Sequence, residues 1–98
     1  MDDREVVYKL LCTDLGRSPA QVPEDVRDYM LSRIDAARAR LEKDGVNVDS
    51  GEADALDLWV MYAAYLYRRR DSDAEMPRSL RLALNDAKVS SAIGRAGT

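Results

Sequence analysis

The sequence contains no histidine, no phenylalanine and only one cysteine, Cys12. Without histidine the chain lacks the usual general base, the commonest metal ligand and every triad that depends on imidazole. A single cysteine cannot form an internal disulfide. Cys12 falls on an expected helix with no histidine to activate it, so we expect a small buried residue rather than a nucleophile. These absences argue against an enzyme.

Long apolar runs and an excess of positive charge are also missing. The longest apolar stretch, 58–67, is about half the length of a membrane span, and no apolar signal segment follows the N-terminus. We therefore expect no membrane partner and no cleaved export signal. The net charge of −3 argues against a protein held on nucleic acid by a general positive field.

Motifs for metals and phosphate are absent as well. The stretch 44–52 has the composition of a calcium loop, but its oxygen ligands and glycines do not fall in the EF-hand register. Carboxylate pairs are numerous, yet nothing in the pattern supplies the burial that would raise a pKa for acid catalysis. We predict no metal, no cofactor and no catalytic residue.

What the sequence does contain is typical of one globular domain. Its 98 residues are 46% hydrophobic and 34% charged. Apolar residues recur at helical spacing throughout, and no segment alternates with the period of a strand. We predict an all-α fold, a compact bundle of about four helices over residues 1–88, followed by a flexible C-terminal tail, 89–98.

Proline, glycine and acidic residues set the expected ends of the helices. Pro23 and Pro77 suit helix starts, and Gly16 and Gly45 suit helix stops. The third helix is expected to begin near a capping box formed by Asp49 and Glu52. It closes on 68–70, three arginines that complement the negative end of a helix dipole.

The second expected helix has an apolar and an acidic side. Its apolar stripe consists of Val26, Met30, Ile34, Ala37 and Leu41. Asp28, Asp35 and Glu42 share the far side, while Arg33 and Arg40 border the apolar stripe. The pattern fits a solvated acidic face with arginine stems covering the edge of the core. It also fits an ionic contact between neighbouring copies.

The third expected helix is apolar all round. One face carries Leu56, Val60, Ala63, Ala64 and Tyr67. The opposite face carries Leu58, Tyr62 and Tyr65. A helix of this kind must be covered on every side. It is either the central element of the bundle, or it lends the face of Leu58, Tyr62 and Tyr65 to a partner.

Arginines gather around the acidic loop 71–75. They are Arg68, Arg69, Arg70, Arg78 and Arg81. They fit helix capping and pairing with the acidic loop. However, Arg78 and Arg81 lie in the first turns of the fourth expected helix, where the dipole disfavours cations. This favours an anionic partner, either on this chain or on another protein. A helix-turn-helix that reads DNA is the weaker alternative, since the helix before them is apolar and its linker acidic.

Three segments occur in an order that points to a family. They are 23–38, rich in alanine and arginine; 57–70, aromatic and apolar with an arginine end; and 76–85, which begins Met76-Pro77-Arg78. This arrangement, which covers residues 5–88, resembles the head–tail connector proteins of tailed bacteriophages. These small adaptors complete the head after DNA packaging.

The resemblance implies a non-enzymatic helical subunit that assembles as a ring under the portal protein. Such a ring extends the DNA channel and offers a docking surface to a tail-side completion or stopper protein, while double-stranded DNA passes without specific binding. It implies the virion head–tail junction as location, and the host bacterial cytoplasm during assembly. The residues expected at subunit or partner contacts are Leu58, Tyr62, Tyr65, Arg68, Arg69, Arg70, Arg78, Arg81, Arg33 and Arg40.

Two other classes remain open on the sequence. A small helical DNA-binding regulator or antitoxin-like dimer would form a compact dimer and bind a duplex in a salt-sensitive way. A plain helical interaction domain is the third possibility.

Overall fold

The structure is a computed structural model that describes residues 3–48, 53–69 and 76–96, without the side chains of 53, 54 and 90–96. Its elements are α1 (Asp3–Asp14), a short 3-10 helix η1 (Pro19–Gln21), α2 (Glu24–Lys43), α3 (Ala53–Arg69) and α4 (Arg78–Ala96). The described ranges contain no strand. The predicted all-α bundle is confirmed.

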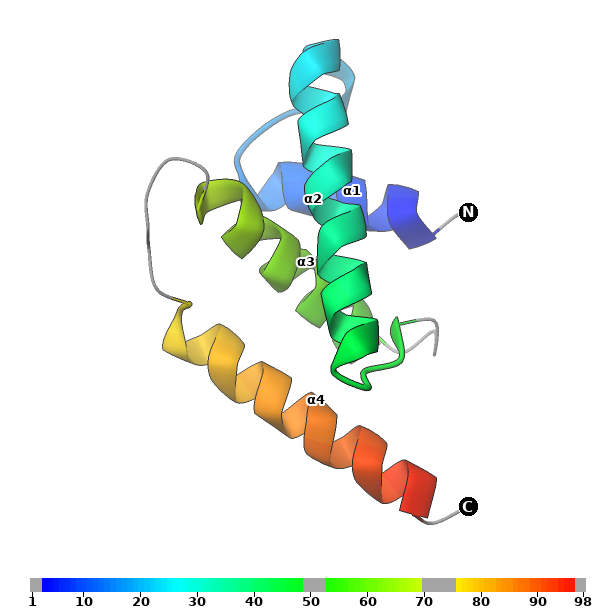
Figure 1. Ribbon diagram of the computed structural model, residues 1–98. Helices are drawn as coiled ribbons and strands as arrows, with labels where there is room; N and C mark the ends of the chain where they lie inside the picture. Colours follow the sequence, from blue (N-terminus) through cyan, green and yellow to red (C-terminus); the bar gives the residue numbers. More distant parts are fainter. Residues whose placement is uncertain (1–2, 49–52, 70–75, 97–98) are drawn as a thin grey trace.

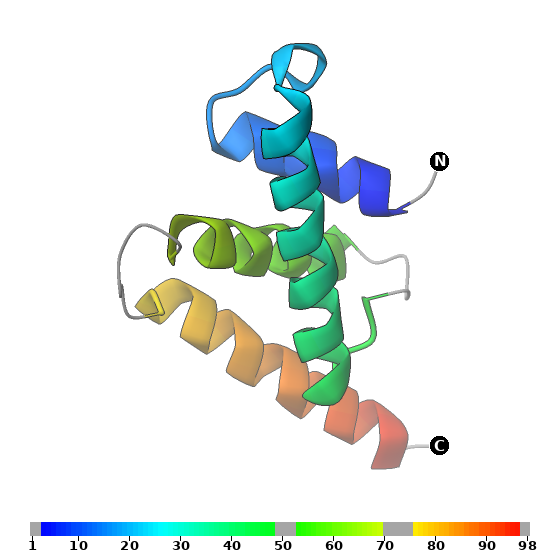
Figure 2. The same cartoon turned by 45° about the horizontal axis from the view of Figure 1, so that its top comes forward.

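Helix α3 is the central element of the bundle. Helices α1, α3 and α4 lie in a row with α3 in the middle, and α2 crosses in front of α1 and α3 (Figures 1 and 2). Accordingly, α3 packs against α1, α2 and α4. Of the two roles that the sequence allows for this helix, the structure has the central one. The row also brings the C-terminal ends of α1 and α3 to the same side as the N-terminal end of α4.

Glycine ends α1 and α2, as predicted. Gly16 and Gly45 have φ angles of 72° and 86°, in the left-handed region where a side chain would be strained. At α2, the backbone N–H of Val46 donates to the carbonyl of Leu41 (2.9 Å), and that of Gly45 donates to Glu42 (3.0 Å). This pair of bonds is a Schellman motif, which satisfies two carbonyls that the helix leaves without an internal partner.

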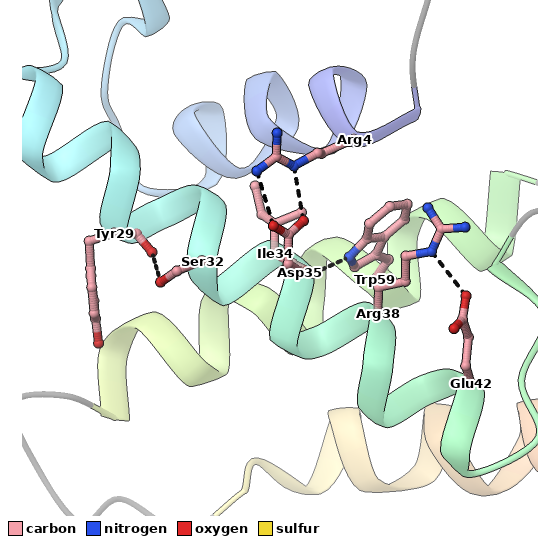
Figure 3. Close-up of polar contacts among 8 residues, drawn as sticks. All are labelled: Arg4, Tyr29, Ser32, Ile34, Asp35, Arg38, Glu42 and Trp59. Carbon is pink, nitrogen blue, oxygen red and sulfur yellow. Dashed lines mark hydrogen bonds and ion pairs between the residues drawn. The ribbon is translucent and has the colours of Figure 1, made fainter.

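The core is anchored by Trp59, the only tryptophan of the chain. Its side chain is completely buried, and its indole N–H donates to the backbone carbonyl of Ile34 on α2 at 2.8 Å (Figure 3). The Arg38 guanidinium lies 5.5 Å from the centroid of the indole ring, within the range of a cation–π contact. Around Trp59 the apolar stripe of α2 is buried as predicted from Met30 to Leu41. On α1, burial raises the pKa of Tyr8 above its ordinary value of 10.0.

Helix α4 is longer than the sequence indicates. Its backbone is helical to Ala96, so the fourth helix enters the segment 89–98 that we predict as a tail. Serine, alanine and isoleucine carry a modest helix penalty at most, and no proline follows Pro77. Gly94, which costs about 1 kcal/mol relative to alanine, lies within the helix and does not end it. The helix boundary expected at residue 88 therefore moves toward the C-terminus.

The acidic face of α2 is largely paired within the chain. Arg4 on α1 donates two hydrogen bonds to Asp35, at 2.9 and 3.0 Å, and Arg38 pairs with Glu42 at 3.0 Å (Figure 3). Asp28 is exposed and forms no ion pair with any described residue. The pairing supports a solvated acidic face, the first of the two interpretations of this side of the helix.

We expect the Arg4–Asp35 pair to contribute modestly to stability. Both side chains are about half exposed, so Asp35→Asn should lower the free energy of unfolding by about 0.5–1 kcal/mol. Urea unfolding at low and high salt measures this loss, which should shrink as salt screens the pair. Asp28→Asn is the matched control on the same helix. An equal loss for both variants would contradict a specific contribution of the pair.

Candidate interaction site

A pocket of about 290 Å³ lies where the ends of three helices meet. Asp14 comes from the end of α1, and Pro77, Ser79 and Leu80 come from the start of α4. The other lining residues among those that the structure describes come from α3: Met61, Ala64, Tyr65, Arg68 and Arg69. The volume is at the lower end of the range for small-molecule sites and suits an inserted side chain.

The polar groups of the pocket come from the end of α3 and from its neighbours. Arg68 pairs with Asp14 at 3.1 Å, which neutralises one of the two guanidinium groups. Arg69 is exposed and forms no ion pair with the described part of the chain. Both arginines lie in the last turn of α3, where their charge complements the helix dipole. The pocket therefore combines an apolar interior with one cation that no carboxylate of the described ranges neutralises.

Three residues that the sequence singles out line this pocket together. Tyr65, Arg68 and Arg69 are all present, and Tyr65 also contacts Tyr62 edge to face, with ring centroids 6.2 Å apart. Spacing on one helix places these residues near one another, because positions three and four apart share a face. The residues that α1 and α4 contribute to the pocket are brought there by tertiary packing, which the sequence pattern does not predict.

Leu58 and Tyr62 are not available to a partner, contrary to the expectation from the sequence. Their exposed fractions are 5% and 6%, and both belong to the core cluster of the chain itself. Helices α1, α2 and α4 surround α3, so the face that we expected to meet a partner is covered within one chain. Tyr65 is half-buried and is the only one of the three that reaches the pocket.

The remaining candidate arginines are spread over the surface. Arg78 and Arg81 are exposed at the start of α4 and do not line the pocket. Arg33 stacks its guanidinium on the Tyr29 ring, 5.4 Å from the centroid, and Arg40 is exposed near the end of α2. Arg70, the Asp49 and Glu52 capping box and the acidic loop 71–75 lie outside the described residues.

Sequence reasoning missed several exposed apolar side chains. The large ones in the described part of the chain are Leu10, Met61, Leu82 and Val89. Leu82 and Val89 lie seven residues apart on α4, on the side opposite to the buried Leu80 and Leu84. Their spacing of seven residues, two turns of a helix, is the signal in the sequence that places them on one face.

The described residues contain neither a metal centre nor a membrane span. No three cysteine or carboxylate side chains of the described ranges gather closely enough to hold a metal ion. No helix in these ranges is sufficiently long and apolar to cross a membrane. The pocket at the ends of α1, α3 and α4 is therefore the candidate site.

Comparison with family models, with curated proteins and with solved structures finds no match for this chain.

Proposed function

We propose that the protein is a structural adaptor at the head–tail junction of a tailed bacteriophage or prophage. In this proposal it forms a ring under the portal, extends the DNA channel and offers a docking surface to a tail-side completion protein. It performs no catalysis, and double-stranded DNA passes through the ring without being gripped.

One observation carries the proposal. Two of the segments on which the family resemblance rests, 57–70 and 76–85, meet in space. The arginine end of α3 lines one pocket together with Pro77, Ser79 and Leu80 at the start of α4. This proximity supports the proposal that both segments belong to one surface that contacts another protein. The acidic net charge of −3 is compatible with a conduit, because a duplex must pass without strong attraction to the wall.

Arg78 and Arg81 are the residues that we assign to the portal. They are exposed at the N-terminal end of α4, where the helix dipole disfavours positive charge by a few tenths of a kcal/mol each. A nearby anionic surface on a partner offsets this cost and gives orientation to the contact.

The corresponding variant separates binding from folding. Arg78→Glu with Arg81→Glu places acids at the positive end of α4, so we expect helix content and unfolding midpoint to be kept or slightly raised. Binding to the portal protein encoded in the same genome should weaken by about tenfold or more. Co-purification and calorimetry measure the binding, with Arg17→Glu as a control at an exposed position that we assign to no contact. Undiminished binding by the double variant would contradict the assignment.

A gel shift tests the DNA-binding regulator as the other class. At roughly physiological salt the adaptor should retard no specific duplex. A specific, salt-sensitive shift together with failure to bind a portal would contradict the adaptor function and favour the DNA-binding regulator.

A further inference from the structure

The exposed side of α4 has the chemistry that complements the pocket. Leu82 and Val89 are 52% and 57% exposed, and Asp86 lies between them on the same side of the helix. Asp86 is exposed and forms no ion pair with any residue that the structure describes. We call this surface, Leu82, Asp86 and Val89, the outer face of α4. It presents two apolar side chains and one unpaired carboxylate.

The pocket presents the reverse combination. Met61, Ala64 and Leu80 supply apolar surface, and Arg69 supplies a guanidinium that no described carboxylate neutralises. A partner that fits therefore inserts an apolar side chain and offers a nearby carboxylate to Arg69.

Among the four large exposed apolar side chains in the described ranges, only those of α4 meet this requirement. Met61 belongs to the pocket itself. Leu10 has an acid one turn further on α1, but that acid is Asp14, which already pairs with Arg68. Leu82 is followed one turn later by the unpaired Asp86.

We propose that the pocket of one copy of this chain receives the outer face of α4 from a second copy. Leu82 enters the apolar part of the pocket, and Asp86 pairs with Arg69 at its edge. Helix α4 lies at the edge of the row of helices, so its outer face is accessible to another molecule (Figure 2).

The two surfaces of this contact are different, so the contact is heterologous. Every copy whose pocket is filled still presents its own outer face to a further copy. The association therefore repeats, and it ends when the rotation between neighbouring copies closes a ring. The inference rests on the proposed function, since it names the two surfaces that join neighbouring subunits of the adaptor. The contact itself requires no phage component, so it is tested on the purified chain alone.

Disulfide trapping tests the arrangement directly. Met61→Cys places a thiol in the pocket, and Leu82→Cys places one on the outer face; the native Cys12 is completely buried. We expect a mixture of the two variants under mild oxidation to give a covalent dimer much faster than either variant alone. Lys9→Cys, exposed on α1, replaces Met61→Cys in the control mixture. A yield no higher than that of this control would overturn the proposal.

Charge reversal tests the proposed ion pair in the same contact. Arg69→Asp and Asp86→Arg should each weaken self-association, measured by sedimentation velocity, by about tenfold, because each places like charges together. The combined variant should recover most of the loss. Full association of either single variant, or no recovery in the combined one, would overturn the pairing.

These results are independent of the adaptor test. If the mixed disulfide forms while the portal does not bind, the subunit contact stands and the proposed function fails. If the portal binds while no mixed disulfide forms, the function stands and this contact fails.

Discussion

Replacing Trp59 by alanine is expected to lower the free energy of unfolding by about 3–5 kcal/mol, more than any other single truncation in this core. The indole is completely buried between α3 and α2, so its removal leaves a cavity that the helices fill only in part. The variant also loses the hydrogen bond to the carbonyl of Ile34. Because small domains are stable by only about 5–15 kcal/mol, this loss is a large share of the total.

Urea unfolding followed by circular dichroism measures the effect, since the variant has no tryptophan left as a fluorescent probe. Trp59→Phe is the matched control. It keeps an aromatic ring in the site but removes the N–H donor, and we expect it to cost about 1–2 kcal/mol. A loss below about 1 kcal/mol for Trp59→Ala would contradict the central place of this residue.

Tyr62→Asp is expected to unfold the chain at neutral pH. The position is 6% exposed, so the substitution removes a buried ring and places a carboxylate among apolar side chains. The two effects together should cost at least about 4 kcal/mol. Trp59 fluorescence and circular dichroism of the purified variant measure the folded fraction.

Tyr65→Asp, three residues further on the same helix, is the control for Tyr62→Asp. Tyr65 is half-buried at the pocket, where Arg68 and Arg69 lie near the new charge. We expect this variant to remain folded, at a cost of about 1–2 kcal/mol, and to lose self-association. Equal stability of the two variants would contradict the assignment of Tyr62 to the core and Tyr65 to the interaction site.

Most of the fold follows from local patterns that the sequence displays. The stops at Gly16 and Gly45 and the buried stripe of α2 depend on spacing along one helix, and each is as predicted. The extension of α4 to Ala96 does not follow from the sequence, because the residues after Val89 are mostly small and polar, and helices and loops share this composition.

The candidate site follows from the sequence only in part. The spacing of Tyr65, Arg68 and Arg69 places them together on α3. However, the packing of three other helices decides which face of α3 is covered. Because both faces of α3 are apolar, the sequence of this helix alone does not show which face is buried. Leu58 and Tyr62 are therefore buried in the core. Leu82 and Val89 are exposed, because α4 packs against the other helices on one side only.

The mass of the assembled protein tests the central claim most directly. We would measure it by light scattering on the concentrated protein, alone and mixed with its portal, and image the largest species in negative stain. The account predicts a discrete species larger than a dimer with a central hole. A mass that never exceeds a dimer in either sample would contradict assembly as a ring.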